Sequence, residues 1–104
     1  MSGRTDPAIL REVWEIIEER AETRPAGSYV ASVLGHRKGM DKALEKLGEE
    51  SVEYIIAAKN GVDEQTIGEA ADLLFHFLLA LKASEIPLDA VLDALARRRA
   101  GDQK

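Results

Sequence analysis

The sequence contains no cysteine, few aromatic residues and no long apolar run, and each absence excludes a class of protein or site. Without cysteine the chain forms no disulfide, no thiolate zinc site and no cysteine nucleophile, which suits a reducing cytoplasm. Aromatic residues are 5% of the composition, and the 45% apolar fraction is mostly Leu, Ile, Val and Ala, which favours helices over strands. No apolar run approaches the roughly 20 residues of a membrane span, and the first segment, MSGRTDPAIL, lacks a signal-peptide core. We therefore expect a cytoplasmic protein with no membrane contact.

Positive charge is also scarce, because the formal net charge of the 104 residues is −5. A nucleic-acid binder normally presents a basic face, so we expect no nucleic-acid partner. The length allows one domain, 1–104, with an ordered core from about 7 to 99. A chain this short buries only about 60–65% of its unfolded surface by itself. The high apolar fraction therefore indicates self-association.

Apolar residues recur at helical spacing in five segments, and no strand-like alternation or internal repeat is present. Four main helices and one short connecting helix are predicted, over approximately 7–21, 28–34, 40–59, 64–84 and from 87 onward. Asp6, Ser28 and Asp63 stand at predicted N-caps, and the Asn60–Gly61 pair ends the third segment. The sequence thus predicts a compact all-α helical bundle.

Acidic residues on the helix predicted over 40–59 lie in nearly apolar surroundings. Glu49, Glu50 and Glu53 share one side of this helix, opposite a more apolar side. Glu53 is the only charged residue in the segment SVEYIIAA, and a helix that is apolar on nearly every side is normally buried. An ordinary solvated acidic face is the alternative interpretation, but it predicts Lys or Arg four residues after each Glu, and none follows within this segment.

The next predicted helix repeats this pattern. Glu69, Asp72 and His76 share one face, and Asp72 and His76 are the only polar side chains in AADLLFHFLLAL. Facing each other, the two helices would place four or five carboxylates around a small volume. Buried carboxylates need a cation, and an all-oxygen ligand set favours Mg²⁺, with Mn²⁺ as the alternative. A di-iron centre is disfavoured because no Glu-x-x-His occurs in the chain.

Basic residues lie close to these acids in the sequence. Lys42 and Lys46 precede the acids at steps of four residues and form a positive patch with Arg37 and Lys38. Pairing of Lys46 with Glu50 along the helix is the alternative use of this charge. Cations beside a metal-binding acid cluster suit a polyphosphate ligand.

The order Glu-x-x-Glu and then Glu-x-x-Asp resembles the metal-binding pattern of the all-α nucleoside triphosphate pyrophosphohydrolases. The segments RPAGSY, GMDKALEKLGEESVEYIIAAK and EAADLLFHFLLAL resemble, in this order, blocks of the phosphoribosyl-ATP pyrophosphatase family, over about residues 9–98. This resemblance implies a helical homodimer that hydrolyses 1-(5-phosphoribosyl)-ATP to 1-(5-phosphoribosyl)-AMP and pyrophosphate, in the second step of L-histidine biosynthesis.

The resemblance also implies roles for individual residues. The metal ligands would be four acids: Glu50, Glu53, Glu69 and Asp72. The substrate contacts would come from six residues: Lys42, Lys46, Arg24, Ser28, Tyr29 and His76. Glu49 would orient or deprotonate the attacking water. For His76, core packing and hydrogen bonding next to the ligands stay equally open.

Two positions depart from the family pattern, and two other functions compete with the one that it implies. The connector from Gly35 to Lys38 is a residue or two longer, and Phe75 stands where Tyr is common. The length and lack of cysteine leave no room for a fused cyclohydrolase domain, so a stand-alone pyrophosphatase is expected. The alternatives are a housekeeping relative that acts on (d)NTPs and a non-catalytic helical dimerisation module. The second leaves Glu53 and Asp72 unexplained.

Overall fold

The computed structural model describes residues 5–99, which contain five α-helices and no strand. The helices are α1 (Ile9–Thr23), α2 (Tyr29–Leu34), α3 (Met40–Asn60), α4 (Asp63–Ala83) and α5 (Leu88–Arg98). The predicted all-α class, with four main helices and one short connecting helix, is confirmed. None of the helices in this range has the length and apolar character needed to cross a membrane.

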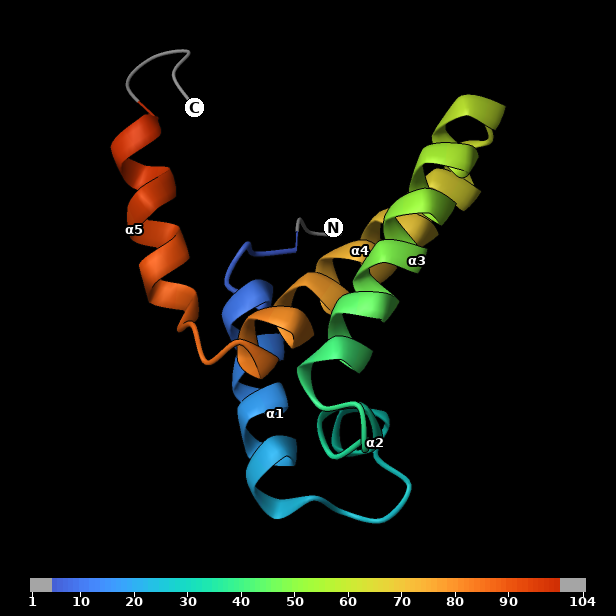
Figure 1. The fold of residues 1–104 in the computed structure, drawn as a ribbon. Coiled ribbons are helices and arrows are strands. Elements are labelled where there is room, and N and C mark those ends of the chain that lie inside the picture. The colour runs from blue at the N-terminus through green and yellow to red at the C-terminus, as the bar shows by residue number, and fades with distance from the viewer. Residues whose placement is uncertain (1–4, 100–104) are drawn as a thin grey trace.

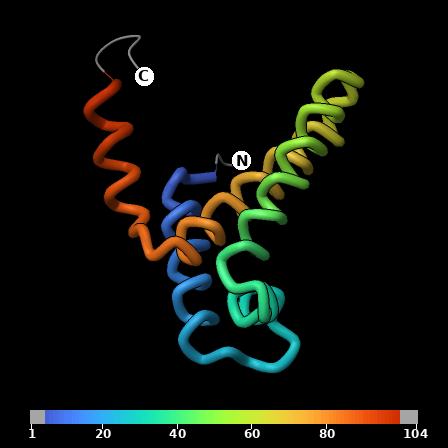
Figure 2. Tube along the Cα trace, viewed as in Figure 1, coloured from blue at the N-terminus to red at the C-terminus, as the bar shows by residue number. Residues whose placement is uncertain are grey.

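Helices α3 and α4 form a long antiparallel hairpin, with α1 and α2 packed at its base (Figure 1). Gly61 closes α3 with φ +76°, a left-handed conformation that glycine adopts without steric cost, so the predicted break at Asn60–Gly61 is confirmed. In the tube view, α5 leads away from the base on the side opposite the hairpin tip (Figure 2). The hairpin tip and α5 therefore project separately from the base of the fold.

The hydrophobic core lies where α1, α2 and the base of the hairpin meet. Its buried members are Trp14, Ile17, Val30, Val33, Ala43, Leu78, Leu79 and Leu88. None of these residues, nor of the apolar side chains packed against them, falls between positions 44 and 74. Among the described residues, this part of the hairpin therefore depends chiefly on the extensive contact between α3 and α4.

The structure tests the three N-caps that the sequence predicts. Ser28 is confirmed as the cap of α2, because its Oγ accepts a hydrogen bond from the Ala31 N–H at 3.1 Å. The prediction for Asp6 is wrong, since α1 begins only at Ile9 and the Asp6 carboxylate instead accepts from Ala8 N–H in the preceding turn. The prediction for Asp63 is also wrong. Asp63 is the first residue of α4, where its charge favours the positive helix end without a capping bond.

The side of α3 that packs on α4 includes Glu50, whereas Glu49 and Glu53 are exposed, so the burial expected for Glu53 is not found. Ala43, Glu50 and Ala57 are buried at seven-residue spacing, and the two small alanines allow the helices to approach closely. On the more apolar side, Leu44 and Ile55 remain 43% and 58% exposed. This orientation turns Glu50 inward between the two helices.

Candidate functional site

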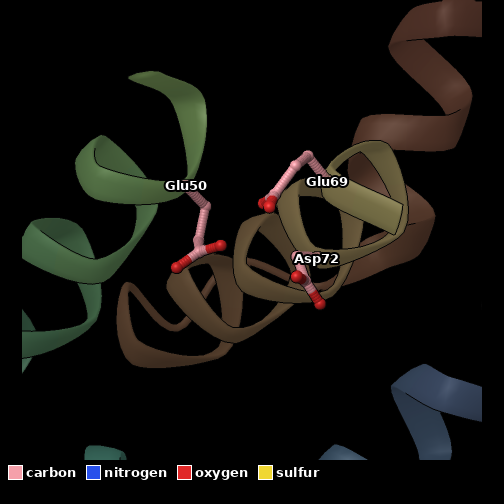
Figure 3. A group of neighbouring side chains, drawn as sticks. All are labelled: Glu50, Glu69 and Asp72. Atoms are coloured by element: carbon pink, nitrogen blue, oxygen red, sulfur yellow. The ribbon is translucent and has the colours of Figure 1, made fainter. Parts of the chain in front are cut away.

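Three carboxylates from α3 and α4 converge in the middle of the hairpin (Figure 3). Glu50 on α3 faces Glu69 and Asp72 on α4, and one carboxylate oxygen of each lies within 4.8 Å of the other two. Glu50 is only 8% exposed, Glu69 is half-buried and Asp72 is exposed. The inward side of α3 supplies Glu50, and the i, i+3 spacing places Glu69 and Asp72 on one face of α4.

Glu53 lies at the edge of this group. It lines a hollow of about 370 Å³ together with Glu69 and Asp72, although it is not among the three residues whose oxygens lie within 4.8 Å. The negative charge of Glu53 helps to raise the pKa of Glu69. All four acids that the sequence singled out as ligands are therefore brought to one region, with three of them in close approach.

The electrostatics of this group call for a positive charge. Burial raises the pKa of Glu69, and the negative charges of Glu53, Asp72 and Glu50 raise it further. The Oε1 atom of Glu69 is buried and has no hydrogen-bond partner among the described residues. A buried polar atom without a partner costs free energy, which a cation at this position would offset.

The donor set fits a hard divalent cation. Three oxygens within 4.8 Å of one another lie at most about 2.8 Å from a common centre, and typical distances to oxygen are about 2.1 Å for Mg²⁺ and 2.3–2.6 Å for Ca²⁺. Small rotations of the flexible side chains would close this difference. Because the three candidate ligands are all carboxylates, the group favours cations that prefer oxygen over those that prefer sulfur or imidazole.

The two candidate lysines are paired with acids on their own helix. Lys46 Nζ contacts Glu49 Oε1 at 3.0 Å, and Lys42 Nζ contacts Glu45 Oε1 at 3.2 Å. The hydrogen bond to Glu49 raises the pKa of Lys46. The pairing along the helix that the sequence left open is thus present, but with the residue at i+3 instead of Glu50. Glu49 consequently lies on the flank of α3 with Lys46, outside the three-carboxylate group.

Tyr29 and His76 form a hydrogen-bonded pair between α2 and α4. The Tyr29 hydroxyl lies 2.9 Å from His76 Nε2, and His76 Nδ1 lies 2.7 Å from the backbone oxygen of Asp72. His76 is 7% exposed, so both roles left open for it, packing and hydrogen bonding, are filled by the same ring. Desolvation by burial raises the pKa of Tyr29, and the nearby charge of Lys46 lowers it in part.

The chain is similar to known proteins over nearly its whole length. Residues 10–99 match the family described as phosphoribosyl-ATP pyrophosphohydrolase. The chain is 66% identical over 91 residues to the phosphoribosyl-ATP pyrophosphatase of Methanoculleus marisnigri, covering 88% of this chain and 94% of the relative. It is 55% identical over 98 residues to the enzyme so named in Methanocorpusculum labreanum, covering 93% and 94% of the two chains. The chain belongs to the phosphoribosyl-ATP pyrophosphohydrolase family. A third relative so named, from Methanosphaerula palustris, is 54% identical over 95 residues, covering 91% of this chain and 96% of its own.

Two residues implied by the likeness to phosphoribosyl-ATP pyrophosphohydrolases have other partners in this structure. The Ser28 hydroxyl is engaged as the cap of α2. Arg24 follows α1 in a left-handed conformation, with φ +48°, and its Nε donates to the Ala21 carbonyl at 3.2 Å. Arg24 instead lines a larger hollow of about 780 Å³ at the ends of α1 and α4, together with Glu18 and Lys82.

Two amide residues beside the acid group are not among the residues that the sequence singles out. Asn60 and Gln65 line the same hollow as Glu53, Glu69 and Asp72. In the sequence, Asn60 stands out only as part of the Asn60–Gly61 pair that ends α3. Gln65 lies four residues before Glu69, and this spacing places both on one face of α4, so a search along that face would have found it.

Proposed function

We propose that this chain is a metal-dependent phosphoribosyl-ATP pyrophosphatase. It hydrolyses 1-(5-phosphoribosyl)-ATP to 1-(5-phosphoribosyl)-AMP and pyrophosphate, in the second step of L-histidine biosynthesis, and it acts in the cytoplasm. The observation that carries this proposal is the convergence of Glu50, Glu69 and Asp72 in a chain of this family. A non-catalytic dimerisation module would have no use for three carboxylates turned toward one another.

Mg²⁺ is the proposed cofactor, with Mn²⁺ as the alternative. Its ligands would be Glu50, Glu69 and Asp72, with Glu53 at the edge of the set, and the unpartnered Oε1 of Glu69 supports this assignment. When bound, the cation supplies positive charge that neutralises phosphate oxygens and the developing charge on the leaving pyrophosphate. The carboxylates would hold this charge at the middle of the hairpin, between α3 and α4.

Lys42, Lys46 and Glu49 are proposed to act on the substrate beside this centre. An incoming phosphate competes with Glu49 for the Lys46 ammonium, and this exchange frees the Glu49 carboxylate once the polyphosphate is in place. Glu49 then accepts a proton from water as the water oxygen attacks phosphorus and pyrophosphate leaves. Positioning and electrostatic stabilisation supply most of the rate enhancement in such phosphoryl chemistry.

Four further residues are proposed from the family resemblance to serve substrate binding, directly or through a neighbouring side chain. Tyr29 and His76 lie beside the acid group, which supports their part in the site. Arg24 and Ser28 belong to the RPAGSY segment, and their part rests on that resemblance alone.

The test of this function is release of pyrophosphate from phosphoribosyl-ATP, measured with Mg²⁺ and with EDTA. We expect turnover that EDTA abolishes and added Mg²⁺ restores. A panel of dNTPs, assayed side by side, is expected to react at least about a hundredfold more slowly, a difference of about 2.7 kcal/mol in the barrier. Preference for dNTPs would instead identify a housekeeping nucleotide pyrophosphohydrolase.

We also propose a homodimer, because the chain leaves much apolar surface exposed. Ile55, Ile67, Leu74 and Leu95 are each more than half exposed. Leu74 lines two apolar hollows, one between α3 and α4 and one between α1 and α4. Sedimentation of the purified chain should therefore show a dimer. Leu74→Glu should shift it to monomer, whereas Glu64→Gln, an exposed change on the same helix, should not. A monomeric wild-type chain would contradict the proposal.

A further inference from the structure

The two ring nitrogens of His76 have different partners, and these partners fix where the proton lies. A backbone carbonyl can only accept a hydrogen bond, so the Nδ1 atom that lies 2.7 Å from the Asp72 oxygen must carry a proton. In a neutral imidazole, the other nitrogen then has a free lone pair. Nε2 therefore accepts from the Tyr29 hydroxyl at 2.9 Å, and Tyr29 is the donor in this bond.

This arrangement makes the Tyr29 oxygen an acceptor toward anything else that approaches it. A phenol has one proton, and that proton is directed to His76. The ring of Phe75 packs edge-on against His76, with centroids 5.2 Å apart, and lies 6.2 Å from the ring of Tyr29. Tyr29 itself is 45% exposed, in contrast to the buried His76. The pair thus runs from the buried His76 ring to the partly exposed Tyr29 side chain.

The position of this oxygen indicates what it accepts from. The Tyr29 hydroxyl is bonded to His76, which is in turn bonded to the backbone of Asp72, so the phenol lies close to the acid group. The charges of Lys46, Glu50 and Asp72 all act on it. The phosphates of a metal-bound polyphosphate are mainly ionised near neutral pH, so their oxygens act as hydrogen-bond acceptors. The nearest donors on a nucleotide are the hydroxyls of the ribose that carries the triphosphate.

We propose that His76 is a positioning residue that fixes the Tyr29 hydroxyl as the acceptor for a ribose hydroxyl of the bound nucleotide. Tyr29 contacts the substrate, and His76 acts only through Tyr29. This inference rests on the proposed function, since it takes a ribonucleotide polyphosphate as the ligand. It adds a contact that distinguishes the sugar, in a site whose other side chains address metal and phosphate.

The proton position is testable without any activity. The chain has two histidines, and the backbone N–H of Lys38 donates to Nδ1 of His36 at 3.1 Å, so His36 should carry its proton on Nε2. Long-range ¹H–¹⁵N spectra of the neutral rings should therefore show opposite tautomers, with the proton of His76 on Nδ1. A proton on Nε2 of His76 would overturn the proposal.

Kinetics with phosphoribosyl-ATP test the role of the pair. Tyr29→Phe keeps the ring but removes the acceptor oxygen, and it should lower kcat/KM about tenfold, equivalent to about 1.4 kcal/mol. His76→Asn can retain the bond to the Asp72 carbonyl but leaves Tyr29 unsupported, so it should cause a similar loss. The two changes combined should cost little more than either alone. His76→Gln, whose amide oxygen can replace Nε2 as acceptor, should recover most of the activity.

Substrate analogues test the sugar contact directly. With analogues that lack the 2′- or the 3′-hydroxyl of the ATP ribose, the loss caused by Tyr29→Phe should disappear for one of the two. An equal loss on all three substrates, or independent effects that multiply to about a hundredfold in the double variant, would overturn the inference. If wild-type chain does not hydrolyse phosphoribosyl-ATP, the proposed function itself fails. If the wild type is active but Tyr29→Phe stays within about twofold of it, only this inference fails.

Discussion

Replacing Glu50 by glutamine should remove most of the affinity for the divalent cation while leaving the fold intact. Glutamine has the shape of glutamate without its charge. Glu50 is 8% exposed and faces Glu69 and Asp72 across the helix contact, so water screens its charge poorly. Removing one partner of a buried ionic interaction costs about 3–5 kcal/mol. At about 1.4 kcal/mol per factor of ten, Mg²⁺ should bind two to three and a half orders of magnitude more weakly.

Thermal unfolding in EDTA and in Mg²⁺ measures this change. At a Mg²⁺ concentration about 100 times the wild-type Kd, the wild type gains about 2.7 kcal/mol of stability, and a variant that binds 100-fold more weakly gains about 0.4 kcal/mol. For a domain of this size, those values correspond to increases in Tm of roughly 10–20 °C and 2–3 °C. In EDTA, Glu50→Gln should be no less stable than wild type, because it removes a repulsive charge.

The matched control is Glu64→Gln, an equal change of charge at an exposed position on α4 outside the hollow. This variant should keep the full Mg²⁺-induced increase in Tm. The metal assignment is refuted if Glu50→Gln retains the wild-type increase, or if the control loses as much as the test variant.

Three further predictions follow from the site and from the cap of α2. Glu53→Gln should leave less than about a tenth of wild-type turnover, which corresponds to more than about 1.4 kcal/mol, and steady-state assays of pyrophosphate release check this. The raised pKa of Glu69 means that the folded metal-free chain binds this proton more tightly than the unfolded chain does. Stability should therefore fall as the pH rises from the ordinary pKa of 4.5 through the raised value, and Glu69→Gln should flatten this fall in unfolding curves recorded in EDTA. Ser28→Ala should cost about 1 kcal/mol of stability through the lost cap, seen as a Tm lower by about 4–8 °C; a change below about 1 °C would argue against that role.

Much of the fold could be predicted because its signals are local. Apolar spacing located the helices, Ser28 had the right side chain before a helical run, and Gly61 supplied the left-handed residue that ends α3. Asp6 and Asp63 have equally suitable side chains but do not cap, since the helix starts shift by one or two residues. The side of α3 that packs inward depends on its partner, and an apolar count alone would have chosen the side with Ile55.

The candidate site was predictable in part for the same reason. The spacing of Glu50, Glu53, Glu69 and Asp72 placed the acids on helix faces, and the structure brings them to one region. The pairing of Lys46 with Glu49, and not with Glu50, was not predictable from the sequence. Ion pairs at i+3 and i+4 on a helix differ in stability by only a few tenths of a kcal/mol. The hydrogen bond between Tyr29 on α2 and His76 on α4 joins residues distant in the sequence, so no local pattern predicts it.

Because the core stops at the base of the hairpin, the two ends of α3 and α4 are held in place by different contacts. The base is held by the core that α1 and α2 form with it, whereas the acids Glu50, Glu69 and Asp72 lie in the middle of the hairpin, among positions that contribute no residue to that core. Their mutual repulsion pushes the helices apart, and a cation between them pulls the helices together. Metal binding would therefore bring α3 and α4 closer together around each incoming substrate, while the base of the hairpin keeps its shape.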